Sequence, residues 1–211
     1  MINRKKKNTT KNLSGGQAAI QCLKKEQVKH VFGLIGSATM EMFDALYHEK
    51  KIKFIGVRDE RTGTHMADGY ARASNKPGII LAGQNGPGAT NLVTGIAQAA
   101  AAFSPIVSIA GFISTKDKIQ DAFQGVDQQS LFKPITKKTW TITKVKNIPK
   151  IFSKAFNLAM SPRRGPVQLN LPRNILSETS KFNINKNEKS YETIDTTKGK
   201  RNDIKKAVKI I

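Results

Sequence analysis

The chain has 211 residues and a formal net charge of +21, and 38% of its residues are hydrophobic, which is enough for a buried core. It has no run of about 18 apolar residues, so the sequence offers no membrane-spanning helix and we expect no membrane partner. The basic N-terminus lacks the apolar stretch of a secretory signal, and the single Cys22 excludes an internal disulfide framework or zinc cluster. These features predict a cytoplasmic protein.

The positive charge would also suit a nucleic-acid-binding protein. Residues 130–177 contain ten Lys and Arg and no Asp or Glu. These charges are spread singly, however, and no aromatic platform for stacking bases lies among them. We therefore interpret them as a solvated face and expect no nucleic-acid partner. Nucleic-acid binding stays a distant alternative, which a steep salt dependence would support. The charge could equally attract small anionic molecules.

The first part of the chain predicts alternating helices and strands. Residues 1–12 are polar and basic and predict a disordered tail. Ser14 is a candidate N-cap for a helix that runs to about residue 27. Residues 31–36 predict a buried strand that leads into a glycine loop, and residues 37–47 predict a helix. Residues 53–57 predict a second, β-branched strand.

The next helix begins at Glu60, directly after that second strand. A carboxylate at a helix N-terminus is commonly no more than a complement to free amide groups and the helix dipole. Ligand sites of open α/β sheets, however, lie beyond the carboxyl ends of the strands, where Glu60 is expected. Residues 77–83 predict a third strand that also ends in a suggestive loop, residues 84–91.

This loop contains Gly86-Pro87-Gly88. Such a turn is stiff and carries little side-chain bulk, so its backbone can approach a planar ligand, although the pattern is also common in ordinary loops. The alternation then continues with a helix over 89–102, strands over 105–111 and 139–145, a helix over 148–160 and a strand over 166–172. The pattern predicts an α/β fold, a three-layer sandwich whose mostly parallel sheet is covered by helices on both faces, over residues 13–175.

The C-terminal part has a different character. Residues 176–200 are mainly polar and predict a linker. Residues 201–211 begin an amphipathic helix that stops in mid-pattern at two isoleucines. We therefore expect them to be the start of a truncated following domain.

Five separated motifs stand out along residues 14–175. They are residues 32–37, Glu60 with residues 65–72, residues 84–91, residues 122–124 and residues 165–172. In order and spacing, this set resembles the N-terminal pyrimidine-binding domain of thiamine-diphosphate-dependent enzymes of the acetolactate synthase group. Two departures from the group's pattern are Arg61, where Gln usually follows the catalytic Glu, and Gly125, where Glu usually follows the Phe-Gln pair.

The resemblance implies thiamine diphosphate as the cofactor and Glu60 as the catalytic residue. In the family this carboxylate bonds the pyrimidine ring nitrogen and promotes the imino tautomer, through which the exocyclic nitrogen removes the thiazolium C2 proton. The further implied cofactor-binding residues are Gly36, Gly86, Pro87, Gly88 and Asn91. The implied substrate-region residues are Ser37, Gln84, Phe123 and Gln124.

The family's magnesium ion is held by a diphosphate domain whose Gly-Asp-Gly motif is absent from these residues. The resemblance also implies a homo-oligomer, a dimer or tetramer, because the pyrimidine domain of one subunit faces the diphosphate domain of another. The chain alone is thus expected to be inactive, either as a fragment of a longer protein or as one half of a split enzyme.

Within the group, the loops at residues 33–38 and 84–88, together with residues 65–69, look more like sulfoacetaldehyde acetyltransferase. Such an enzyme would convert sulfoacetaldehyde and phosphate, both anionic, to acetyl phosphate and sulfite. The alternatives are an enzyme like the large subunit of acetolactate synthase, another 2-oxo-acid enzyme, or a noncatalytic pyrimidine-domain fragment.

Overall fold

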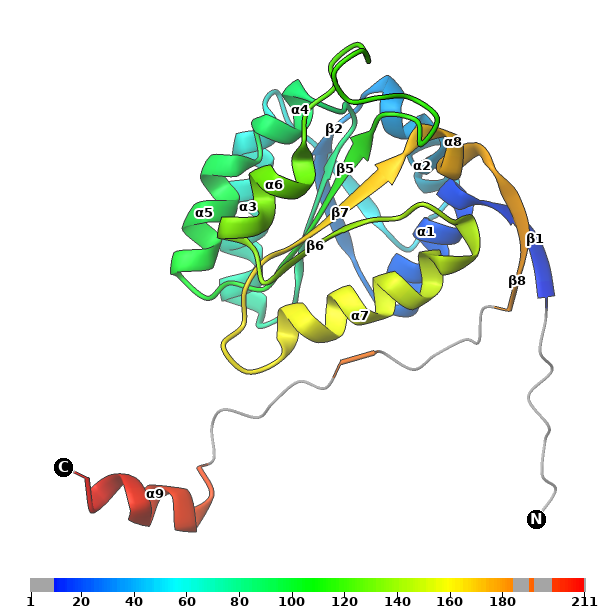
Figure 1. Cartoon of the computed structure of the whole chain (residues 1–211). Helices are drawn as coiled ribbons and strands as arrows, with labels where there is room; N and C mark the ends of the chain where they lie inside the picture. Colours follow the sequence, from blue (N-terminus) through cyan, green and yellow to red (C-terminus); the bar gives the residue numbers. More distant parts are fainter. Residues whose placement is uncertain (1–9, 184–189, 192–198, 211) are drawn as a thin grey trace, which may run out of the picture.

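The computed structural model describes residues 10–183, 190–191 and 199–210. Its centre is a six-stranded sheet in the order β3-β2-β4-β5-β7-β6, and every neighbouring pair is parallel (Figure 1). The strands are β2 His30–Leu34, β3 Lys53–Gly56, β4 Gly78–Ala82, β5 Ile106–Phe112, β6 Lys138–Thr141 and β7 Val167–Pro172. The central strands β4, β5 and β7 are buried almost throughout, as their continuous apolar runs predict.

Helices cover the two faces of this sheet. The α-helices are α1 Gly15–Lys25, α2 Met40–Tyr47, α3 Glu60–Ser74, α4 Pro87–Thr90, α5 Val93–Ala101, α6 Gln128–Phe132, α7 Ile148–Met160, α8 Arg173–Ser177 and α9 Arg201–Val208. Short 3-10 turns lie at Ser37–Thr39, Lys133–Ile135 and Val145–Asn147. Figure 1 shows α1 and α7 on one side of the sheet and α3, α5 and α6 on the other. The expected α/β sandwich with a parallel sheet is confirmed.

Each side of the sheet has its own hydrophobic core. The larger core joins α1, α2 and α7 to the sheet, with Leu23, Met42 and Phe152 fully buried in it. The smaller core joins α3 and α5 to the sheet through Ala67 and Ile96. Since each helix presents one apolar stripe to the sheet, the two cores fix how the strand ends are arranged.

Local signals place several elements correctly. Ser14 caps α1 through a capping box, in which its hydroxyl accepts from the Gln17 backbone amide at 3.1 Å and the Gln17 side chain accepts from the Ser14 amide at 3.0 Å.

Two elements have bounds that differ from those expected. The helix expected over 89–102 begins earlier, at Pro87, and divides into α4 and α5. The strand expected over 139–145 ends at Thr141, and Val145 instead starts a 3-10 turn.

The ends of the domain differ from the expected tail and linker. Strand β1 (Thr10–Ser14) pairs antiparallel with β8 (Thr179–Asn183), which places residues 10–12 and 179–183 in a second, two-stranded sheet. This pairing joins residues 165 to 173 positions apart in the sequence, so no local pattern reveals it, and Phe182 adds a buried ring to the larger core. Residues 1–9 of the expected tail, and most of the expected linker, lie outside the described residues. The division into domain, linker and following domain stays a prediction.

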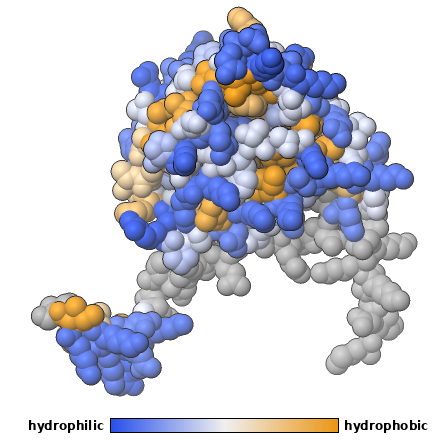
Figure 2. Space-filling view, in the orientation of Figure 1, coloured by the Kyte–Doolittle hydropathy of each residue, from blue (hydrophilic) through white to orange (hydrophobic). Residues whose placement is uncertain are grey.

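The surface is mixed in polarity. Figure 2 shows hydrophobic residues as patches among hydrophilic ones on the visible face. Large apolar side chains exposed near the carboxyl ends of the strands include Ile35, Met40 and Phe123. In the part of the chain that the structure describes, no helix combines the length and apolarity that crossing a bilayer requires.

Candidate active site

Glu60 lies where the sequence places it, at the first position of α3 and close behind the carboxyl end of β3. The preceding Asp59 is the N-cap, and its carboxylate accepts a 2.8 Å hydrogen bond from the Arg61 amide. The adjacent carboxylates therefore differ in role, since Asp59 satisfies the helix end while Glu60 is only 4% exposed. The capping explanation for an acidic residue here applies to Asp59, which leaves Glu60 available for another task.

The two carboxylate oxygens of Glu60 have different surroundings. Oε2 accepts a 3.0 Å hydrogen bond from Nδ2 of Asn91, which follows α4. Oε1 has no hydrogen-bond partner among the described residues, and it faces Gly88, where an added Cβ would lie 3.1 Å away. One oxygen is thus fixed by the protein, while the other borders a turn without side chains. This arrangement fits a flat ring that presents a nitrogen to a carboxylate, as the pyrimidine of thiamine diphosphate does.

The Gly86-Pro87-Gly88 turn is shaped by close contacts. Gly86 has φ +53°, a left-handed conformation that favours glycine, and a Cβ there would lie 2.2 Å from the Gln124 carbonyl oxygen. Pro87 then opens α4 at a position where no amide donor is needed. The turn is therefore held between Glu60 on one side and Gln124 on the other.

The expected substrate-region residues form a chain of side-chain hydrogen bonds. The Ser37 hydroxyl donates to Oε1 of Gln84 at 3.1 Å, and Nε2 of Gln84 donates to Oε1 of Gln124. Gly36, just before Ser37, is pressed against Gly83, where an added Cβ would lie 2.0 Å from the Gly36 nitrogen. The amides of Ala38 and Thr39 also bind the Gly83 carbonyl, at 3.0 and 3.2 Å. The loop after β2 is therefore fastened to the loop after β4.

The structure brings nine of the ten expected site residues into one contact network and leaves one side chain apart. Gly88 connects the two halves of the network, because its added Cβ would lie 3.1 Å from both Glu60 Oε1 and Gln84 Cβ. The Phe123 ring is 86% exposed and only its backbone carbonyl joins the network, through Asn85. Asn85 is the residue that the sequence interpretation did not select. Its position inside the glycine loop was the one available signal.

Helix α3 is anchored by a buried charge cluster two turns beyond Glu60. Arg72 donates to both carboxylate oxygens of Asp68 at 2.9 Å, and Gln98 of α5 donates to Oδ2 at 3.1 Å. Burial alone would raise the pKa of Asp68, but hydrogen bonds involving Arg72, Ser104 and Gln98 together lower it below its ordinary value. Asp68 is thus a charged residue that connects α3 to α5 through the hydrogen bond from Gln98.

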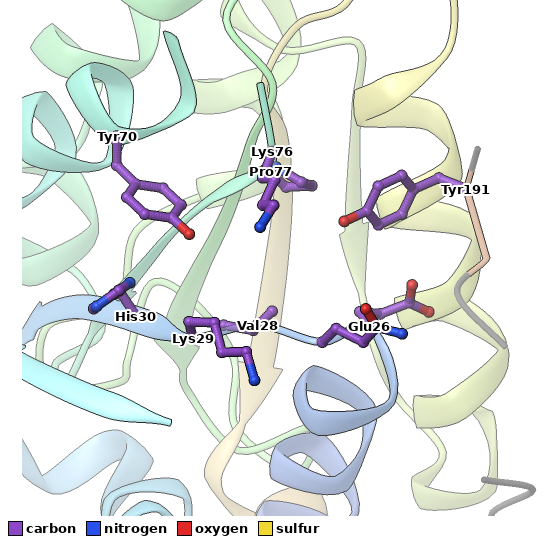
Figure 3. Close-up of a pocket in the computed structure, with 9 residues that line it drawn as sticks. Glu26, Val28, Lys29, His30, Tyr70, Lys76, Pro77 and Tyr191 are labelled. Carbon is purple, nitrogen blue, oxygen red and sulfur yellow. The ribbon is translucent and has the colours of Figure 1, made fainter. Parts of the chain in front are cut away.

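A small pocket lies at the opposite end of the sheet, near the start of β2 and just before β4 (Figure 3). Tyr70 and Tyr191 enter it from opposite sides with their hydroxyls directed toward each other. Burial, with smaller contributions from Glu26 and Tyr70, raises the pKa of Tyr191 to about 12, so this phenol is neutral at physiological pH. None of the expected site residues lines this pocket.

The described residues contain no group of three or more His, Cys, Asp or Glu side chains arranged to hold a metal ion. A magnesium ion in the diphosphate domain therefore stays a prediction about residues outside this structure.

Comparisons with known proteins identify the family of the chain. The family model described as "Thiamine pyrophosphate enzyme, N-terminal TPP binding domain" matches residues 13–131. The acetolactate synthase large subunit of Buchnera aphidicola subsp. Schizaphis graminum is 41% identical over 203 residues, which cover 94% of this chain and 35% of that protein. A probable acetolactate synthase large subunit of Methanococcus aeolicus is 42% identical over 202 residues, covering 94% and 33%. Acetolactate synthase isozyme 3 large subunit of Escherichia coli (strain K12) is 37% identical over 203 residues, covering 94% and 35%.

This chain spans about a third of the length of these curated relatives. The expected closeness to sulfoacetaldehyde acetyltransferase finds no support, because these relatives carry the name of acetolactate synthase. The expected place in the acetolactate synthase group does find support.

Proposed function

Because the chain belongs to the thiamine pyrophosphate enzymes, of which it contains the N-terminal TPP-binding domain, we propose that it is the pyrimidine-binding part of an acetolactate synthase large subunit. The observation that carries the proposal is the buried Glu60, with one oxygen fixed by Asn91 and the other directed at Gly88. The names of the similar proteins favour acetolactate as the product. The reaction would then join two pyruvate molecules with loss of carbon dioxide.

Glu60 has the main chemical task in this proposal. Thiamine diphosphate, when bound, supplies a carbon that can carry negative charge and so activates a 2-oxo acid. Glu60 would hold a proton at Oε1, shared with a pyrimidine nitrogen, while Asn91 keeps the carboxylate from rotating through its bond to Oε2. The turn at Gly88 would border the ring, since no side chain separates it from Oε1.

Other parts of the active site would come from outside these 211 residues. Magnesium and the diphosphate group would be held by a second domain, and a homodimer or homotetramer would bring that domain against the Glu60 end of the sheet. The substrate would be anionic, which the positive charge of the chain suits. Without that second domain, these 211 residues would not catalyse the reaction.

The decisive experiment is the Glu60→Gln substitution in a preparation that includes the diphosphate-binding partner. Glutamine keeps the size of the side chain but cannot shuttle the proton, so deuterium exchange at C2 of thiamine diphosphate, followed by proton NMR, should slow by about 100-fold or more. Glu49→Gln is the control, because the Glu49 side chain is also largely shielded, at 9% exposure, but pairs with Lys24 away from the site. Exchange at the wild-type rate in Glu60→Gln would refute the role.

The choice of substrate has its own test. The wild-type preparation should form acetolactate from pyruvate. Release of sulfite from sulfoacetaldehyde and phosphate, with no acetolactate from pyruvate, would contradict the proposed product and restore the acetyltransferase. Failure of both reactions, with no binding of thiamine diphosphate, would favour a noncatalytic pyrimidine-domain fragment.

A further inference from the structure

Gln124, at the edge of the candidate site, is held in a costly backbone conformation. Gln124 has φ +59°, in the left-handed region that a non-glycine residue rarely adopts. The preceding Phe123 ring is 86% exposed, so burial of this ring does not stabilise the conformation. A strained segment persists only where its surroundings determine it, so the contacts of the two residues must account for their position.

Those contacts come from three consecutive residues of the loop after β4. Gln84 binds the Gln124 side chain, and Gly86 leaves room for the Gln124 carbonyl oxygen. Between them, Asn85 donates from Nδ2 to the carbonyl of Gln124 at 3.1 Å and to that of Phe123 at 3.4 Å. Asn85 is only 8% exposed, and both of its bonds cross about 38 residues of sequence. The Asn85 side chain therefore binds the backbone of this segment through two hydrogen bonds.

We propose that Asn85 is a positioning residue that fixes Phe123 and Gln124 beside the cofactor-binding turn. The catalytic consequence of this inference rests on the proposed function. The clamp, by which we mean the two hydrogen bonds from Asn85 to the backbone of residues 123–124, does not depend on it. The loop after β4 contains the turn that borders Glu60, and the same loop binds residues 123–124. It therefore fixes the position of this segment relative to Glu60. Asn85 therefore determines where the Phe123 ring and the Gln124 amide meet a substrate.

The Asn85→Asp substitution tests the clamp without activity. Aspartate has the same shape but lacks the amide donor, and its oxygens would face two carbonyl oxygens. The Gly125 amide, which donates to the Ala122 carbonyl at 2.9 Å, is a reporter inside the segment. Hydrogen–deuterium exchange of peptides covering residues 119–127 should become about tenfold faster. Asn85→Ala, which adds no charge, should show the same direction.

Asn157→Asp is the matched control. Asn157 of α7 also donates its side-chain amide to a backbone carbonyl, that of Ser190 at 2.9 Å, so the same chemical change is made outside the site. Exchange in residues 119–127 should stay at the wild-type rate in this control. Wild-type exchange in both Asn85 variants, or equal acceleration in Asn157→Asp, would overturn the clamp.

The catalytic consequence is measured with the diphosphate-binding partner present. The KM for the 2-oxo acid should rise about tenfold in Asn85→Asp, while C2 deuterium exchange, which depends on Glu60, should stay within about twofold of the wild type. Loss of both would indicate general disruption and contradict a positioning role. If the wild type makes no acetolactate, the proposed function fails, and the exchange experiment still decides whether Asn85 holds the segment.

Discussion

The buried carboxylate of Asp68, which joins α3 to α5, gives the most quantitative prediction. The substitution is Asp68→Asn, which preserves the shape of the side chain but removes the charge that Arg72 and Gln98 bind. An asparagine amide would also direct donor hydrogens at the donors of Arg72. Since α3 begins with Glu60, loosening this helix bears on the candidate site as well as on stability.

The magnitude follows from the burial of the two partners. Removing one partner of a fully buried ion pair costs about 3–5 kcal/mol, whereas an exposed pair contributes about 0–1 kcal/mol. The Asp68 side chain is 4% exposed and that of Arg72 is 50% exposed, so the cost lies between these limits, at about 2–3 kcal/mol. For a chain of this size, this loss lowers Tm by about 4–12 °C.

The cost must also depend on pH, with a defined sign. The pKa of Asp68 is lowered in the folded state, so the carboxylate stabilises the fold above the ordinary Asp pKa of about 3.9. This stabilisation is lost as the pH falls below that value and through the folded pKa, because protonation removes the charge. The difference between the wild type and Asp68→Asn should be complete at pH 7 and should shrink below about pH 4.

Thermal unfolding followed by circular dichroism at pH 7 and pH 3.5 measures both effects. Asp44→Asn is the control, because Asp44 is 70% exposed and lies 3.9 Å from His48, and its Tm should change little. A Tm for Asp68→Asn within about 1 °C of the wild type at pH 7, or an equal loss at both pH values, would refute the reasoning.

Two further predictions concern the glycines and the cysteine. Gly86→Ala should lower the free energy of unfolding by about 2 kcal/mol, because Gly86 has a left-handed φ and the added Cβ would meet the Gln124 carbonyl oxygen. Gly69→Ala inside α3 should raise the free energy of unfolding by about 0.5–1 kcal/mol, because the added Cβ meets nothing within 4 Å. Changes of the same sign in urea unfolding would contradict this reasoning. Burial raises the pKa of Cys22 to about 12, so iodoacetamide at pH 8 should label this thiol only in the unfolded chain, and rapid labelling of the folded protein would exclude the buried position.

The elements that the sequence predicts well are those with a local signature. The continuous apolar runs of β4 and β5 indicate strands buried on both faces, and the Ser14 capping box marks the start of α1. Both signals depend on residues within a few positions of each other. Alternation of such strands with helices was then enough to predict the parallel sheet.

The elements that the sequence does not predict depend on distant partners. Strand β8 is mostly polar and acquires its conformation by pairing with β1. Helix α6 has only five residues, too few for a periodic pattern, and Phe132 at its end is fixed by the smaller core. Tertiary contacts, rather than propensity, determine these segments.

The candidate site shows the same division. Glu60 is recognisable from its place between a strand and a helix, but its bond to Asn91 spans 31 residues and needed the fold to be seen. Asn85 could not be selected from its residue type, because an asparagine in a glycine loop usually serves the local turn. Only the positions of the Phe123 and Gln124 carbonyls reveal its role.

The loop at residues 84–88 was one basis for the expected closeness to sulfoacetaldehyde acetyltransferase, which the similar proteins do not support. The loop begins with Gln84 and Asn85, whereas acetolactate synthases usually have Ser-Gly-Pro-Gly at this place, and this difference favoured the acetyltransferase. In the structure, Gln84 uses one end of its amide to accept from Ser37 and the other to donate to Gln124, and Asn85 uses its donor on residues 123–124. Since these amides are engaged within the chain, their identity reflects how the loop holds its neighbours. A motif at these positions therefore reports contacts within the chain and does not by itself identify the substrate.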